Sequence, residues 1–153
     1  MKEVTAAIIR DGEKILICQR SAEDECAMLW EFPGGKREKG ESLEECIIRE
    51  IREELELEIK FLGEFAQSVY CLNGNKIHFT VYNAEVIGGV LKLNVHNAVE
   101  WVTVHELGGY EFMPADIEFV EKLIKDSRQG DRDLSDDLKP GYQAKSTLMN
   151  NAI

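Results

Sequence analysis

Short apolar segments, separated by turn residues, mark the predicted strands of this chain. Asp11-Gly12 stands between the first two apolar segments, and Asn73-Gly74 stands between two later ones. Both dipeptides favour the tight turns of β-hairpins, so we expect two antiparallel strand pairs. The predicted strands cover residues 2–10, 14–20, 59–72, 76–86 and 99–104.

A helical period replaces the strand pattern between residues 43 and 55. This stretch holds no glycine or proline, and its apolar positions recur every fourth residue, as one buried face of a helix requires. Ser42 stands where an N-cap is expected, and Glu45, three residues later, completes the pattern of a capping box. The apolar positions are Leu43, Ile47, Ile51 and Leu55.

A second helix is predicted at the end of the patterned region. Pro114 suits the first turn of a helix, and apolar residues follow at helical spacing from Ala115 to about Lys125. Beyond that point the chain is polar and aperiodic, so we expect one domain at residues 1–127 and a flexible polar tail at residues 128–153. Strands, helix, strands and helix in this order predict an α+β fold.

Three glutamates interrupt the apolar character of the first helix. At about 100° per residue, Glu50 and Glu54 fall in the sector of the apolar stripe, and Glu53 lies beside them. Carboxylates at this spacing repel one another, and burying them unpaired costs on the order of several kcal/mol. A solvated acidic face is the simpler interpretation, but a divalent cation such as Mg²⁺ or Mn²⁺ relieves both the repulsion and the burial. We therefore predict a metal site at this helix.

A glycine turn comes shortly before this helix. Pro33 fixes one backbone angle, while Gly34 and Gly35 allow the backbone to approach a ligand closely. A divalent cation beside such a turn suits a diphosphate substrate, because the cation neutralises phosphate oxygens and lowers the pKa of a bound water. The Gly34 carbonyl is a further candidate metal ligand. Arg49 stands four residues before Glu53, so the two side chains are able to pair.

The net negative charge of the chain limits the classes of partner that we expect it to bind. Its 153 residues carry a formal net charge of −11, which argues against long nucleic acid or an anionic membrane but allows a single nucleotide reached through a bound metal. Cys18 and Cys46 fall in a predicted strand and a predicted helix, as buried, reduced thiols do. We expect neither a signal peptide nor a membrane-spanning segment, and therefore a cytoplasmic protein, either monomer or homodimer.

The stretch from residue 35 to residue 57 resembles the signature of the Nudix hydrolases. That signature reads Gly-x5-Glu-x7-Arg-Glu-U-x-Glu-Glu-x-Gly-U, where U is bulky and aliphatic. Eight of its nine specified positions match here, beginning at Gly35, Glu41 and Arg49. The departure is Glu56, which stands where the signature has glycine. Either Glu56 occupies a left-handed helix cap at a cost of about 1 kcal/mol, or the helix runs slightly longer.

The resemblance implies a fold, a chemistry and a set of site residues. It implies an α/β/α sandwich around a mixed β-sheet, and Mg²⁺-dependent hydrolysis of a nucleoside diphosphate linked to a further group. Many relatives have an additional glutamate before the last strand, but residues 94–96 read Asn-Val-His here, and His96 and Glu100 are poor substitutes. The residue that activates water is therefore left open between Glu50 and Glu53. The implied metal ligands are Gly34, Glu50, Glu53 and Glu54, and the implied catalytic residues are Glu53, Glu50, Arg49 and Glu41.

The flanks of the signature resemble the MutT-like branch of the family. Residues 29–36 read LWEFPGGK and residues 113–116 read MPAD, which is similar to bacterial 8-oxo-dGTP diphosphatases and CTP pyrophosphohydrolases. This resemblance implies hydrolysis of a nucleoside triphosphate to the monophosphate and pyrophosphate, as in sanitation of the nucleotide pool. The implied substrate-binding residues are Arg20, Phe32, Gly35, Lys36 and Asp116.

Several alternatives stay open at this point. Phe32 also suits plain core packing, and Asp116 also suits a helix start, where an acid is favoured by the helix dipole. Other Nudix substrates, such as a nucleotide sugar or a dinucleoside polyphosphate, fit the same signature. A Nudix-like module that binds a nucleotide without cleaving it is a further hypothesis.

Overall fold

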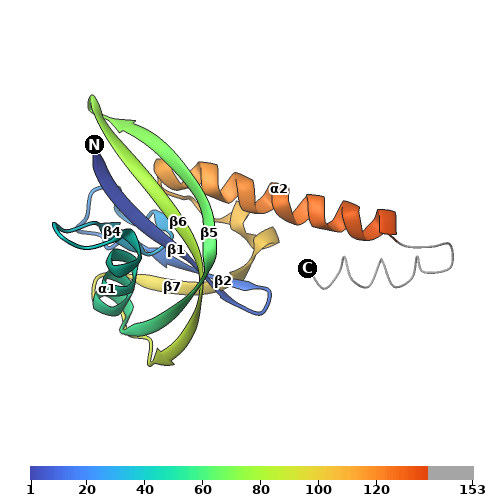
Figure 1. Cartoon of the computed structure of the whole chain (residues 1–153), viewed down its shortest axis with the longest axis horizontal. Coiled ribbons are helices and arrows are strands. Elements are labelled where there is room, and N and C mark those ends of the chain that lie inside the picture. The colour runs from blue at the N-terminus through green and yellow to red at the C-terminus, as the bar shows by residue number, and fades with distance from the viewer. Residues whose placement is uncertain (138–153) are drawn as a thin grey trace.

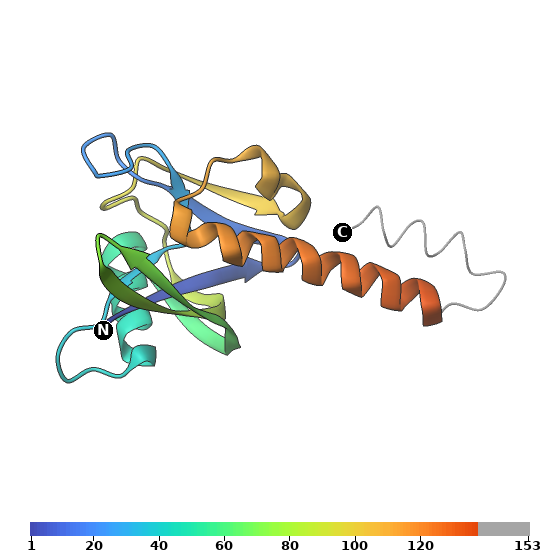
Figure 2. The ribbon, with the colours of Figure 1, turned by 90° about the horizontal axis from the view of Figure 1, so that it is seen from above.

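Within residues 1–137, the part of the chain that the structure describes, seven strands form one mixed β-sheet. This computed structural model describes side chains as far as residue 130. Figure 1 shows α1 on one side of the sheet and α2 on the other, and Figure 2 shows the same layers from above. The elements are β1 (Lys2–Asp11), β2 (Lys14–Gln19), β3 (Trp30–Glu31), β4 (Gly34–Lys36), α1 (Leu43–Leu55), β5 (Leu57–Leu72), β6 (Asn75–Gly89), β7 (Ala98–Thr103), the 3₁₀ helix η1 (Val104–Gly109) and α2 (Pro114–Asp137).

β1 is the central strand of the sheet. The strand order is β3-β2-β1-β6-β5, with β4 paired to β1 and β7 paired to β2. β1 and β6 run parallel, whereas the other described strand pairs are antiparallel. The predicted α+β class, mixed sheet and two hairpins are therefore confirmed. β4 pairs with the first half of β1, which places the glycine turn against the centre of the sheet.

The two hydrophobic cores lie on opposite faces of this sheet. Ile9 of β1 packs with Ile47 and Ile51 of α1. Ile8, one residue earlier, packs in the other cluster with Phe119 of α2. Because successive strand residues point to opposite faces, one apolar strand supplies both cores. The result is the α/β/α sandwich that the sequence resemblance implies.

Both ends of α1 lie where the sequence predicts. The Ser42 hydroxyl accepts a hydrogen bond from the Glu45 N–H at 3.0 Å and caps the first turn. At the other end, Glu56 takes a left-handed conformation with φ 56° and ψ 34°, and its N–H closes the last turn. The first alternative for Glu56 is therefore correct, because a residue other than glycine occupies the left-handed cap.

Replacing Glu56 by glycine is expected to stabilise the fold. The left-handed conformation strains a residue that carries a Cβ, so the free energy of unfolding of E56G should rise by up to about 1 kcal/mol in urea denaturation. Glu56→Ala is the matched control, because alanine removes the carboxylate but keeps the Cβ. An E56G protein no more stable than E56A would contradict the assignment of strain to this cap.

α2 is longer than the sequence predicts. It continues to Asp137, so the predicted end near Lys125 is wrong. The stretch after Lys125 lacks an apolar period, but no proline interrupts it, and Lys122 pairs with Asp126 along the helix at 2.8 Å. The predicted start of the tail at residue 128 lies inside this helix, which extends past the sheet in Figure 1. The rest of the predicted tail, residues 138–153, lies outside the described residues.

Two further findings concern membranes and thiols. Nowhere in the described part of the chain does a helix have the length and apolar character needed to cross a bilayer. All four cysteines are free, with Cys18 and Cys46 buried as predicted and Cys26 and Cys71 exposed.

Candidate active site

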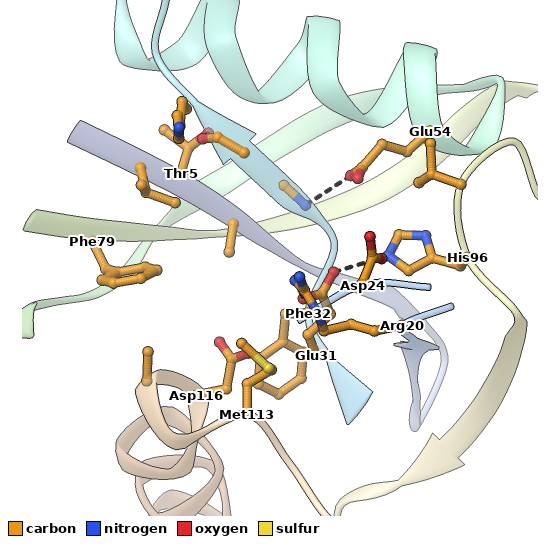
Figure 3. Close-up of a pocket in the computed structure, with 17 residues that line it drawn as sticks. Thr5, Arg20, Asp24, Glu31, Phe32, Glu54, Phe79, His96, Met113 and Asp116 are labelled. Atoms are coloured by element: carbon orange, nitrogen blue, oxygen red, sulfur yellow. Dashed lines mark hydrogen bonds and ion pairs between the residues drawn. The ribbon is translucent and has the colours of Figure 1, made fainter. Parts of the chain in front are cut away.

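One pocket gathers all five predicted substrate-binding residues where β1, the glycine turn and the end of α1 meet. Its volume is about 360 Å³, which lies in the range of small-molecule sites. Figure 3 shows the loop before β7 and the start of α2 at its other sides. The predicted residues that line it are Arg20, Phe32, Gly34, Gly35, Lys36, Glu54 and Asp116, whereas Glu41, Arg49, Glu50 and Glu53 are not among its lining residues.

The glycine turn touches both the central strand and α1. A Cβ on Gly34 would come within 2.0 Å of the Thr5 carbonyl oxygen, and a Cβ on Gly35 within 2.4 Å of the Glu50 carboxyl carbon. Larger residues therefore do not fit here without moving a strand or a candidate metal ligand. The Gly34 N–H donates to Glu54 Oε1 at 3.1 Å, so the turn and a helix carboxylate are joined directly.

Arg49 organises three of the predicted glutamates. It donates to Glu41 from Nε at 3.0 Å and from Nη2 at 2.7 Å. Its Nη1 donates to Glu50 at 3.0 Å and to Glu53 at 3.1 Å, which confirms the predicted pairing with Glu53. The hydrogen bonds from Arg49 lower the pKa of Glu41 to about 2, and those same bonds to Glu41 raise the pKa of Arg49. Glu41 thus supports Arg49 from outside the pocket.

The three glutamates of α1 differ in burial. The Glu53 side chain is 59% exposed, more than its place beside the apolar stripe predicts, whereas Glu50 is only 16% exposed. Burial, together with the charges of Glu31 and Glu50, raises the pKa of Glu54 to about 8. Burial also raises the pKa of Glu50. Both carboxyl groups therefore ionise at a cost that a nearby cation would remove.

The donor set of this region fits a hard divalent cation. Carboxylate and carbonyl oxygens are the ligands that Mg²⁺ and Mn²⁺ prefer, and the raised pKa values of Glu50 and Glu54 show that burial disfavours their charged forms. Among the described residues, no three acidic, histidine or cysteine side chains already converge on one point. Arg49 holds Glu50 and Glu53, while the Gly34 N–H holds Glu54. The chemistry of the residues fits a metal, and the ligand set stays a prediction.

Phe32 and Asp116 form another wall of the pocket (Figure 3). Phe32 is 3% exposed and packs against Phe112 with ring centroids 5.5 Å apart, so this residue belongs to both the core and the pocket. Asp116 is 6% exposed, and burial raises its pKa well above the ordinary value. The Phe32 backbone and the charge of Arg20 lower this pKa and partly offset the effect of burial. Asp116 is therefore a pocket residue as well as a residue of the first turn of α2.

Glu31 is a charged pocket residue that sequence reasoning missed. It accepts hydrogen bonds from Arg20 Nη1 and from His96 Nε2, each at 2.9 Å. Glu31 is the last residue of β3 and Phe32 follows it, and so short a strand shows no period that would place both side chains in one pocket. His96 lines the pocket too, whereas Glu100, the other proposed substitute for the missing acid, is exposed on β7 and does not.

The sandwich fold, the glycine turn and the arginine-held glutamates of α1 define a Nudix hydrolase. The family model described as the NUDIX domain matches residues 1–123. The chain therefore belongs to the Nudix family, and the resemblance of its signature is confirmed. The single departure from that signature, Glu56, keeps the left-handed conformation that glycine otherwise supplies.

Curated relatives match most of the chain. It is 40% identical to the CTP pyrophosphohydrolase of Escherichia coli K12 over 125 residues, which cover 81% of this chain and 92% of that protein. It is 36% identical to the putative 8-oxo-dGTP diphosphatase 2 of Mycobacterium tuberculosis H37Rv over 124 residues, or 80% of this chain and 86% of that protein. Both relatives carry names of nucleotide-hydrolysing enzymes.

Solved structures match over the same region. The solution structure of the E. coli ORF135 protein aligns with a TM-score of 0.74 and 37% identity, covering 82% of this chain and 89% of that one. The crystal structure of the MutT protein from Methanosarcina mazei Go1 aligns with a TM-score of 0.71 and 28% identity, covering 82% and 94%. The relatives and the structures agree on a MutT-like Nudix hydrolase.

Proposed function

We propose that this protein hydrolyses a nucleoside triphosphate to the nucleoside monophosphate and pyrophosphate, with Mg²⁺ bound. One observation carries the proposal above all. The Gly34–Glu54 hydrogen bond joins the glycine turn to the acidic helix inside a pocket whose wall holds Phe32 and Asp116. In this proposal the phosphates lie at the glycine turn, and the nucleoside lies beside Phe32 and Asp116. The names of the curated relatives support the same reaction class.

The proposed metal ligands are the carboxylates of α1 and one backbone oxygen. Glu50, Glu53, Glu54 and the Gly34 carbonyl would hold Mg²⁺, and Mn²⁺ suits the same oxygen ligands. When bound, the ion neutralises phosphate oxygens and lowers the pKa of a coordinated water. Either Glu50 or Glu53 would accept the proton of the attacking water. The water oxygen forms the new bond to phosphorus as the bond to the bridging oxygen breaks.

Arg49 and Glu41 act indirectly in this proposal. Arg49 already bonds Glu50 and Glu53, so it fixes the direction of both carboxylates along α1. Glu41 in turn fixes Arg49 through two hydrogen bonds. This chain of contacts keeps the acids pre-organised, which lowers the cost of arranging them in the transition state.

The proposed nucleoside-binding residues come from separate parts of the chain. Phe32 would pack against the base, and Asp116 would hydrogen-bond its polar edge. Arg20 lies beside them in the pocket, while Gly35 and Lys36 line the side near α1. Cytosine nucleotides, including modified dCTP, and 8-oxo-dGTP are the first substrates to test, because the relatives are named for CTP and 8-oxo-dGTP.

A panel of nucleotides with product identification tests this function. Canonical and oxidised triphosphates, a nucleotide sugar and a dinucleoside polyphosphate are each incubated with Mg²⁺, with Mn²⁺ and with EDTA. We expect metal-dependent release of pyrophosphate and monophosphate from at least one triphosphate. Sugar phosphate as the main product would move the assignment to another Nudix substrate class. Tight binding of a triphosphate with no cleavage by either metal would overturn hydrolysis in favour of a binding module.

A further inference from the structure

The carboxylate of Glu31 is clamped from two sides inside the pocket. Arg20 Nη1 donates to its Oε1 and His96 Nε2 to its Oε2, both at 2.9 Å, and the side chain is only 15% exposed (Figure 3). Arg20 is itself fixed, because its Nε donates to the Glu25 carbonyl at 2.9 Å. The negative charge of Glu31 acts on both Glu54 and Asp116. Glu31 thus stands between the metal side and the nucleoside side of the pocket.

His96 reaches Glu31 because its loop is docked on the end of α1. The last carbonyls of a helix lack partners within the helix, and this loop supplies several. The Lys92 N–H donates to the Leu55 carbonyl at 2.9 Å, and the Asn94 N–H donates to the Glu54 carbonyl at 3.1 Å. Asn94 Nδ2 donates to the Glu53 carbonyl at 2.8 Å. The helix that carries the acids therefore also sets the position of His96.

His96 has one polar contact in the site. Its side chain is 2% exposed, and Nδ1 is buried with no hydrogen-bond partner among the described residues. A carboxylate only accepts, so His96 bonds Glu31 through a proton on Nε2. Among the described residues, the imidazole therefore makes its hydrogen bond to Glu31.

We infer that His96 is a positioning residue that, together with Arg20, aims the Glu31 carboxylate at an O–H or N–H donor of the bound nucleoside. This inference rests on the proposed function, since it assumes a nucleotide in this pocket. Glu31 is the group that would touch substrate, and His96 only orients it. Loss of His96 then weakens nucleotide binding more than it slows the chemical step.

Two isosteric substitutions separate this role from simple packing. The side-chain nitrogen of glutamine is as many bonds from Cα as Nε2 of histidine, whereas the nitrogen of asparagine corresponds to Nδ1. H96Q is therefore able to donate to Glu31, and H96N is not. We expect kcat/KM for the best triphosphate to fall about tenfold in H96N, mainly through KM, and to stay within about threefold in H96Q.

Two further variants complete the test. E31Q should lose about as much as H96N, and the double variant E31Q/H96N should be no worse than E31Q, because coupled residues are not additive. His105, an exposed histidine on η1, supplies the control H105A, which should keep wild-type constants. Thermal melting by circular dichroism checks that every variant is folded.

Three outcomes would overturn the inference. They are wild-type kinetics in folded H96N, equal loss in H96Q and H96N, and additive losses in the double variant. If the unaltered protein releases no pyrophosphate from any triphosphate, the proposed hydrolysis fails instead. Calorimetric binding of CMP and GMP then tests His96 separately. A dissociation constant about tenfold higher in H96N than in the unaltered protein supports the inference. A dissociation constant unchanged in H96N, or no binding by the unaltered protein, refutes it.

Discussion

Glu53→Gln lowers kcat by about 10²- to 10⁴-fold while the protein stays folded, if the proposed chemistry is correct. Glutamine keeps the size of the side chain but provides neither a charged metal ligand nor a proton acceptor. The fold should tolerate the change, because the side chain is 59% exposed and Arg49 keeps its two bonds to Glu41. The measurement is kcat at saturating Mg²⁺ for the best triphosphate of the panel.

A neighbouring glutamate supplies the control for E53Q. Glu45 is exposed on the same helix, and only its backbone N–H takes part in a described contact, the bond to Ser42. E45Q removes the same charge from α1 and should keep wild-type kcat. Near-wild-type turnover in E53Q, or an equal loss in E45Q, would remove the basis for assigning catalysis to the inner acids of α1.

Glu54→Gln is expected to abolish metal-dependent activity and, at the same time, to stabilise the metal-free protein. Burial, aided by the charges of Glu31 and Glu50, raises the pKa of Glu54 from 4.5 to about 8, so at neutral pH folding forces this carboxyl group to take up a proton. Because a tenfold change in an ionisation equilibrium corresponds to about 1.4 kcal/mol, this forced protonation destabilises the fold by about 3 kcal/mol at pH 7. Glutamine is neutral in both the folded and the unfolded protein, so it avoids this cost, and its amide oxygen still accepts from the Gly34 N–H.

The stability gained by E54Q over the wild type should increase with pH. Because the folded-state pKa of Glu54 is raised, stability is lost as pH rises from 4.5 towards 8 in the wild type, and E54Q lacks that loss. In EDTA, the melting temperature of E54Q should exceed that of the wild type clearly at pH 8 and only slightly at pH 5. Added Mg²⁺ should stabilise the wild type and not E54Q. A constant gap between the two proteins across this range would refute the explanation.

Local sequence signals were enough to predict α1 and the acids that it carries. The stripe of Ile47 and Ile51, the Ser42 cap and the positions of Glu50 and Glu54 all follow from spacing along one helix, and the structure has each of them. The hairpins follow equally from short turn sequences. These features need no knowledge of distant parts of the chain, because each is decided within about ten residues.

Contacts between distant segments were beyond the sequence pattern. Glu31 and His96 lie 65 residues apart, and neither has a local partner that reveals the pair. β3 and β4 are two and three residues long, too short for a period to appear. The extension of α2 to Asp137 was missed for a different reason, because a polar helix without an apolar stripe resembles an unstructured segment.

The left-handed residue at the end of α1 bears on how members of this family are found. A search that demands glycine at that point of the signature would pass over this protein, although its backbone turns there with φ 56°. The fold requires a particular direction of the chain at the end of α1. Glu56 provides that direction at the cost of a small backbone strain. Motif definitions written as backbone geometry would therefore recognise enzymes that definitions written as letters exclude.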